Sequence, residues 1–150
     1  MDKVQFAGEF KLDKCELISS TGTFADISAI VVEINIFESI FKTALTGSVI
    51  ITDTNNLVDN MPIIGQEFLS LKISTPGLVN KDLAYDFTEN VFCVYELGGR
   101  TPASSNSEVI ELKICSPELL KNHRVRVSKA YEETVDKIVT SILENPKYIN

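Results

Sequence analysis

The chain has 150 residues, enough for one domain with a substantial core, and its hydrophobic fraction of 44% is that of a folded protein. Its net charge of -7, from 21 acidic and 14 basic residues, argues against binding to a nucleic-acid backbone, which depends on clustered lysine and arginine. Cys15, Cys93 and Cys115 are widely spaced and odd in number, which indicates reduced thiols and disfavours a disulfide framework or a zinc site. The N-terminal residues lack the apolar run of a signal peptide, and we expect no membrane insertion.

The chain opens with an alternating segment. Phe10 and Leu12 alternate with Lys11 and Asp13, which predicts a first strand over residues 9–18. The turn-rich residues 19–23 then end that strand.

Residues 27–53 form the longest apolar, β-branched stretch, and they predict two long strands joined by a bulged corner. Apolar residues recur at every second position, namely Ile30, Val32, Ile34 and Ile36 in the first arm and Val49 and Ile51 in the second. Gly47 supplies the backbone freedom that a bend, a bulge or a close approach requires. Such a ribbon is not stable alone in water, so it must pack on a second sheet or on another copy of itself.

Three further strands are predicted downstream of this ribbon. Residues 67–75 and 109–115 alternate clearly between apolar and polar side chains. Residues 83–97 alternate as well, but the polar residues 88–90 mark either a bulge in one long strand or a turn between two.

Two intervening segments carry loop signals. Pro62 cannot donate to a central ladder, so residues 61–67 are expected to cross a sheet edge or a barrel end. Residues 98–107 are the most loop-like stretch of the sequence and therefore a candidate contact region.

The C-terminal part changes from strand to helix periodicity. Ser116 and Pro117 begin a short helix over about residues 117–121, and residues 124–127 are a candidate last strand. Apolar residues spaced by three and four predict an amphipathic helix over residues 131–143.

The elements together predict a mainly β fold, either a β-barrel or a two-sheet sandwich of six to seven strands. A short helix and a C-terminal amphipathic helix complete it. The expected division is a barrel domain over residues 1–128 and a helical extension or linker over residues 129–150.

The sequence offers little catalytic chemistry. His123 is the sole histidine and stands in a polar turn with no nucleophile motif nearby. Carboxylates are frequent but scattered, so any pair could be proposed as a glycosidase dyad, and such a signal needs a cleft to have value. We therefore expect neither an enzyme nor a cofactor or metal site.

Three segments, in their order along the chain, resemble the N-terminal barrel of the baseplate hub proteins of T4-like contractile-tailed bacteriophages. They are Phe37-Glu38-Ser39, the T-G-x-x-x-I-x-D pattern of residues 46–53, and the P-I-I-G-x-E pattern of residues 62–67. Residues 128–143 are similar to the helix that follows this barrel, and the whole resemblance spans about residues 10–143. Hubs of this family usually carry a second barrel and further domains after that helix.

The resemblance implies a structural protein that acts by assembly. Its barrels, tail-tube-like in fold, would close a homo-oligomeric ring, a trimer or a hexamer, around the tail channel, with long ribbons pairing across neighbouring subunits. The ring would join the tail tube to the central spike and contact wedge proteins, in a virion baseplate assembled in the host cytoplasm. DNA would only pass through the channel, and an acidic wall suits that passage because it does not hold phosphates.

The resemblance also implies which residues make contacts. The ring interface would comprise Ile30, Val32, Ile34, Ile36, Phe37, Glu38, Val49, Ile51 and Asp53. Contacts to the neighbouring tube, wedge or spike proteins would come from Met61, Pro62, Ile63, Ile64, Gly99 and Arg100.

Two other classes of function fit the sequence. One is a monomeric barrel that encloses a small apolar ligand, which would require an interior cavity. The other is a hydrolase with a carboxylate pair, which would lose turnover when Glu33, Glu38 or Asp53 is replaced by its amide.

Overall fold

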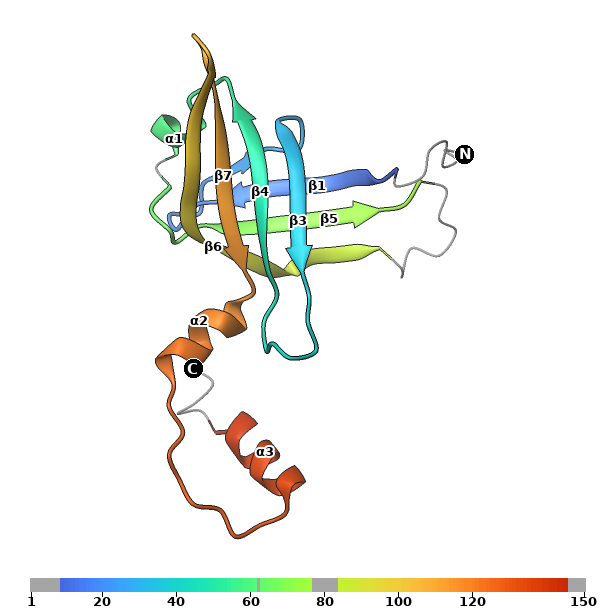
Figure 1. Cartoon of the computed structure of the whole chain (residues 1–150), viewed down its shortest axis with the longest axis vertical. Helices are drawn as coiled ribbons and strands as arrows, with labels where there is room; N and C mark the ends of the chain where they lie inside the picture. Colours follow the sequence, from blue (N-terminus) through green and yellow to red (C-terminus); the bar gives the residue numbers. More distant parts are fainter. Residues whose placement is uncertain (1–8, 62, 77–83, 146–150) are drawn as a thin grey trace.

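A computed structural model of the chain describes residues 9–61, 63–76 and 84–145. Within these residues, antiparallel strands form a seven-stranded curled sheet, a half-barrel with the order β2-β1-β5-β6-β7-β4-β3, accompanied by three short helices (Figure 1). The elements are β1 (Lys11–Ile18), β2 (Phe24–Asp26), β3 (Val31–Phe37), β4 (Thr46–Asp53), α1 (Leu57–Asn60), β5 (Phe68–Ser74), β6 (Tyr85–Ser104), β7 (Ser107–Cys115), α2 (Pro117–Arg124) and α3 (Val135–Leu143). The prediction of a mainly β, barrel-like fold is confirmed.

The sheet folds over on itself because β6 belongs to both of its halves. The first part of β6 pairs with β5, and its second part pairs with β7 from Cys93 onward. In Figure 1, β1 and β5 accordingly run across the vertical set of β7, β4 and β3. The register between β5 and β6 jumps between Leu69 and Leu71, which lie opposite Phe92 and Phe87. The polar step at residues 88–90 is therefore a bulge within one long strand.

The core fills the concave side of this curled sheet. Its fully buried side chains include Cys15, Leu17, Ile27, Val49, Ile51, Leu69, Leu71, Phe92, Val94, Ile110, Leu112 and Ile114. The clear alternation in β5 and β7, and the weaker alternation in β4, thus pointed to the correct buried face.

The first arm of the predicted ribbon differs from its prediction. Residues 27–30 form a turn, and β3 begins only at Val31. A bulge between Val31 and Glu33 lets Val31 pack on the core with Ile34 and Ile36, whereas the Val32 side chain is 65% exposed. The assignment of Val32 to the same face as Ile34 was wrong because the bulge shifts the alternation by one residue.

Gly47 of β4 lies at a close approach between the two strands of the ribbon. A Cβ atom at this position would be 2.2 Å from the backbone oxygen of Asn35 on β3. The close approach that the sequence allowed at Gly47 is therefore present, and it brings the backbones of β3 and β4 together.

Other boundaries also moved. Residues 98–104 continue β6, because register shifts at Leu97/Arg100 and Pro102/Ser104 absorb the irregular residues within a hairpin. The last strand predicted at residues 124–127 is absent from the described chain, since α2 extends to Arg124. The one-turn helix α1 was not predicted, and Leu83 lies outside the described residues.

Candidate assembly surface at the β3–β4 hairpin

The outer edge of β3 is open. β3 is the last strand of the sheet and pairs only with β4, so among the described residues its other edge has no strand beside it. An unpaired edge presents a row of N–H and C=O groups that another chain can pair with. The edge therefore supplies a ready surface for adding a strand.

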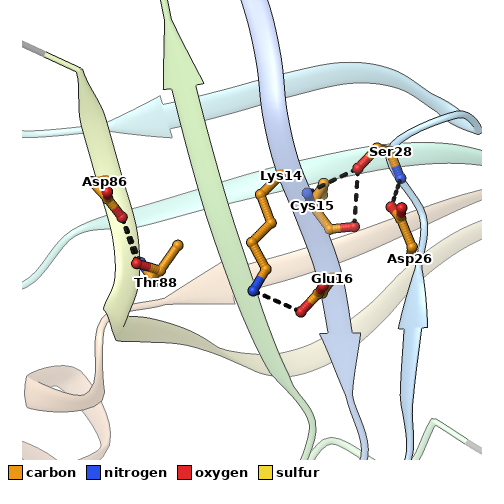
Figure 2. A network of polar contacts seen from close by, with 7 residues as sticks. All are labelled: Lys14, Cys15, Glu16, Asp26, Ser28, Asp86 and Thr88. Carbon is orange, nitrogen blue, oxygen red and sulfur yellow. Dashed lines mark hydrogen bonds and ion pairs between the residues drawn. The ribbon is translucent and has the colours of Figure 1, made fainter. Parts of the chain in front are cut away.

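The beginning of the hairpin is fixed to β1 by Ser28. The backbone N–H of Cys15 donates to Ser28 Oγ at 2.9 Å, and Ser28 Oγ donates to the Cys15 carbonyl at 3.4 Å (Figure 2). The Ser28 N–H also donates to Asp26 Oδ1 at 2.9 Å, and hydrogen bonding to Ser28 lowers the pKa of Asp26. The N–H of Ile27 donates to the same Cys15 carbonyl at 2.9 Å. These bonds hold the turn between β2 and β3 against β1.

The loop between β3 and β4, residues 38–45, is called the hairpin loop below. It projects beyond the sheet at the end where α2 also lies (Figure 1). Two large apolar residues occupy its tip, with Ile40 93% and Phe41 90% exposed, and Phe37 at the end of β3 is exposed as well. Apolar groups displayed at a projecting tip are typical of a contact site.

The base of the hairpin loop is anchored to α2. The Leu45 N–H donates to Ser116 Oγ at 3.1 Å, and the Ser116 N–H donates to the Leu45 carbonyl at 2.9 Å. A groove of about 320 Å³ separates the rest of the loop from Pro117 and Phe92. The loop is therefore fixed at its base while its tip stays exposed.

The predicted ring-interface residues fall into two groups. Val32, Phe37 and Glu38 are exposed, and Ile30, Ile34 and Ile36 are half-buried against the core. Val49, Ile51 and Asp53 are buried within the chain itself. Their side chains cannot touch a neighbour while this fold is kept, so their assignment to an interface is corrected.

Asp53 has a structural role at the end of β4. Its Oδ1 accepts the Asn55 N–H at 2.9 Å, and its Oδ2 accepts the Leu57 N–H at 2.6 Å. These bonds satisfy N–H groups at the start of α1. The aspartate of the T-G-x-x-x-I-x-D pattern is thus used by the turn that follows the strand.

Glu67 has a comparable role in the P-I-I-G-x-E segment. Its buried carboxylate accepts the N–H groups of Ile64 at 2.8 Å, Gly65 at 2.9 Å and Gln66 at 3.1 Å. Gly65 has a φ of 83°, which the tight turn around the carboxylate requires. The glutamate side chain therefore organises the loop that leads into β5.

The predicted contacts to neighbouring proteins are only partly on the surface. Met61 is buried and belongs to the core, which corrects its assignment, and Ile63 packs partly against the core. Ile64 is exposed, whereas Pro62 lies outside the described residues. Gly99 and Arg100 are exposed on β6, where Arg100 pairs with Glu108 of β7.

Titratable side chains do not converge on a reactive cluster in the described chain. His123 is exposed on α2, and no group of three or more His, Cys, Asp or Glu residues that could hold a metal ion occurs among the described residues. Cys15 and Cys115 are fully buried, and burial raises the pKa of Cys15 to about 12 and that of Cys115 to about 11. These thiols stay protonated near neutral pH and pack as small apolar groups.

The described residues include no helix long and apolar enough to cross a lipid bilayer. No protein-family model and no curated protein matches the sequence.

Proposed function

We propose that this chain is a ring-forming barrel of a phage tail baseplate hub, which surrounds the tail channel and joins the tail tube to the central spike. The observation that carries the proposal is the β3–β4 hairpin, with its open outer edge and its projecting apolar tip. The resemblance of residues 10–143 to hub barrels of contractile-tailed phages supplies the biological setting.

The open edge of β3 supports ring formation for a physical reason. β3 has seven residues, and natural proteins usually protect an edge strand with charged residues, proline or a cover, because an open edge invites association. β3 carries one charged residue, Glu33, beside four β-branched aliphatic residues. A neighbouring copy that pairs with this edge would form hydrogen bonds to the unpaired backbone N–H and C=O groups of β3. A closed ring repeats this contact between every pair of neighbours and leaves no subunit with a free edge.

The exposed tip supports contact beyond that edge. Ile40 and Phe41 contribute nothing to the core of their own chain, so their apolar surface is available to a neighbouring subunit. Burying each of them in an interface would contribute roughly 1.5–3 kcal/mol. Pairing along the β3 edge would fix how neighbouring subunits are oriented, and burial of the hairpin-loop tip would increase the affinity between them.

A barrel that encloses a small ligand is supported less well. The concave side of the sheet is filled by side chains such as Leu71 of β5, Phe92 of β6 and Leu112 of β7, all of them fully buried. The groove beside the hairpin loop lies at the end of the sheet near α2, outside this filled interior.

The mass of the isolated chain in solution tests the proposal. Light scattering should give about 50 or about 100 kDa for a trimer or hexamer of the 16.6 kDa chain, and negative-stain images should show rings with a central channel. Val32→Lys on the open edge and Phe41→Asp at the tip should each reduce the mass to that of a monomer.

Both substituted side chains are exposed, so thermal unfolding followed by circular dichroism should change little. Val32→Thr is the control for Val32→Lys. It keeps the shape of the valine side chain and adds no charge, so this variant should still form rings. A wild-type chain that stays monomeric at every concentration would contradict the proposal, as would rings that neither variant weakens.

A further inference from the structure

The helix α3 exposes part of its apolar surface, whereas its Ile138 and Ile142 are half-buried. Val135, Val139 and Leu143 lie on one side of it and are exposed, and none of its residues is buried. No other described element packs closely against it, and Figure 1 shows it standing apart from the sheet. Isolated helices of nine residues are marginal in water, so this face needs a covering surface.

A groove of suitable chemistry lies between α2 and the start of β5. It has a volume of about 580 Å³, and its apolar lining includes Phe68, Cys93, Pro117 and Leu120. Lys121 and Arg124, on the last turn of α2, also line it. We call this the α2 groove, and its volume is within the usual range of binding clefts.

The charges of the α2 groove and of the α3 segment are complementary. Lys121 and Arg124 form no ion pair with any residue that the structure describes. Glu67, which also lines the groove, is occupied by three backbone N–H groups. The groove therefore presents two cations that form no ion pair with the described residues, beside an apolar floor.

The α3 segment supplies the opposite charge. Residues 131–145 contain four acidic side chains, Glu132, Glu133, Asp136 and Glu144, against the single basic residue Lys137. None of these four carboxylates forms an ion pair within the described part of the chain. The segment is thus apolar on one face and acidic around it, which matches the groove on both counts.

We propose that α3 of one copy docks into the α2 groove of the next copy, with Glu132 and Glu133 facing Lys121 and Arg124. The inference rests on the proposed function in that it takes the neighbouring ring subunit as the partner. Each subunit then gives one helix and receives one, a head-to-tail contact that closes around a ring. In this contact, the basic residues at the end of α2 bind the acidic residues of the neighbouring α3 segment.

The segment that joins the two helices favours the neighbouring copy over the chain's own groove. Residues 125–134 separate α2 from α3 and span at most about 36 Å when extended. They leave α2 in extended conformation at Val125, and Figure 1 shows them running away from the sheet before α3 begins. The α2 groove begins beside Arg124, directly before this segment. To place α3 in the groove of its own chain, the segment would have to fold back on itself.

Zero-length crosslinking of mixed isotopes tests the inference. Unlabelled and nitrogen-15 chains are unfolded together in urea, refolded and treated with a carbodiimide, which joins a lysine amine to a carboxylate in contact with it. Mass spectrometry should find Lys121 joined to Glu132 or Glu133 in peptides that combine the two isotopes. Crosslinks of a single isotope only would place α3 on its own chain and overturn the inference, as would no crosslink at this pair.

Charge reversal provides the second arm of the test. The double variant Lys121→Glu/Arg124→Glu should weaken self-association by roughly tenfold or more. Adding Glu132→Lys and Glu133→Lys should restore it, because the pairs are then re-formed with opposite signs. Lys129→Glu also reverses a basic residue, but outside the α2 groove, and should not weaken association.

The results separate this inference from the proposed ring. Rings that form without a mixed-isotope crosslink would overturn the helix exchange and leave the ring intact. A mixed-isotope crosslink in particles that are not rings would support the exchange and contradict the hub proposal. Rings that the charge-reversal variant does not weaken would again overturn the exchange alone.

Discussion

β3 and β4 belong to one hairpin and have similar apolar sequences, yet the fold uses them differently. β4 lies between β3 and β7, and it buries every second residue from Gly47 to Asp53. β3 has a neighbour on one side only, and its bulge turns Val32 outward. The position of a strand in the sheet, more than its apolar composition, thus decides whether it is buried and paired on both sides or keeps an edge that another chain can pair with.

The largest expected effect tests how tightly β3 is held on β4. Gly47→Ala would place a Cβ atom 2.2 Å from the Asn35 carbonyl, and a backbone atom in a paired strand cannot easily move away. We expect a loss of about 3 kcal/mol in the free energy of unfolding, measured by urea denaturation. Gly99→Ala, where an added Cβ meets open space, is the matched control and should change stability little.

The next prediction removes the same two methyl groups from each strand. Val49→Ala deletes them from a fully buried site and should cost roughly 2 kcal/mol of unfolding free energy. Val32→Ala deletes them from an exposed site and should stay within about 0.5 kcal/mol. Urea denaturation of the monomeric protein measures both losses. Equal losses would mean that Val32 is as buried as Val49 and would contradict the difference between the two strands.

This pair of valines also shows what the sequence can and cannot predict about the fold. Where alternation is uninterrupted, as in β5 and β7, the buried face was predicted correctly. At Val31-Val32 two β-branched apolar residues are adjacent, and nothing local tells which of them a bulge will turn outward. Likewise, Gly98, Gly99 and Pro102 resemble a loop, although long-range pairing with β7 keeps them within β6.

The third prediction concerns one acidic residue in each strand, Asp53 at the end of β4 and Glu33 within β3. Asp53→Asn keeps at most one of the two hydrogen bonds that the carboxylate accepts at the start of α1, because an amide nitrogen cannot accept, and it should cost about 1 kcal/mol. Glu33→Gln on β3 alters an exposed contact with Asn35 and should cost little. Chemical denaturation of both variants measures the difference, and a larger loss for Glu33→Gln would contradict it.

The candidate site was predicted only in part, for related reasons. The ribbon was located correctly, but the inward side chains of β4 and the outward tip at Ile40 and Phe41 depend on which neighbours each strand finds. The role of Asp53 had a local signal, because an aspartate two residues before Asn55 favours an Asx turn. The Glu67 contacts required the positive φ of Gly65, which the spacing of glycine and glutamate merely permits.

The smallest expected effect lies on the outer face of the sheet, where charge holds strands together instead of burial. Lys72 of β5 contacts Asp86 of β6 at 2.5 Å, and hydrogen bonds from Lys72 and Thr88 lower the pKa of Asp86 from 3.8 to about 2. Because the pKa is lower in the folded chain, the carboxylate stabilises the fold above its unfolded value of 3.8, and this contribution is lost as the pH falls from there toward about 2.

Asp86→Asn removes the titrating carboxylate and should flatten the acid dependence of stability between those two values, whereas Lys72→Met leaves the Thr88 hydrogen bonds and should flatten it only in part. The pair is partly exposed, so the matching loss of stability at neutral pH should be small. Urea denaturation at a series of pH values measures this. The buried side chains of Val49 and Ile51 in β4 do not titrate, so their contribution to the free energy of unfolding should not depend on pH. The ion pairs on the outer face should lose their contribution as the pH falls. An unchanged acid limb in both variants would show that the pair contributes nothing to holding β5 on β6.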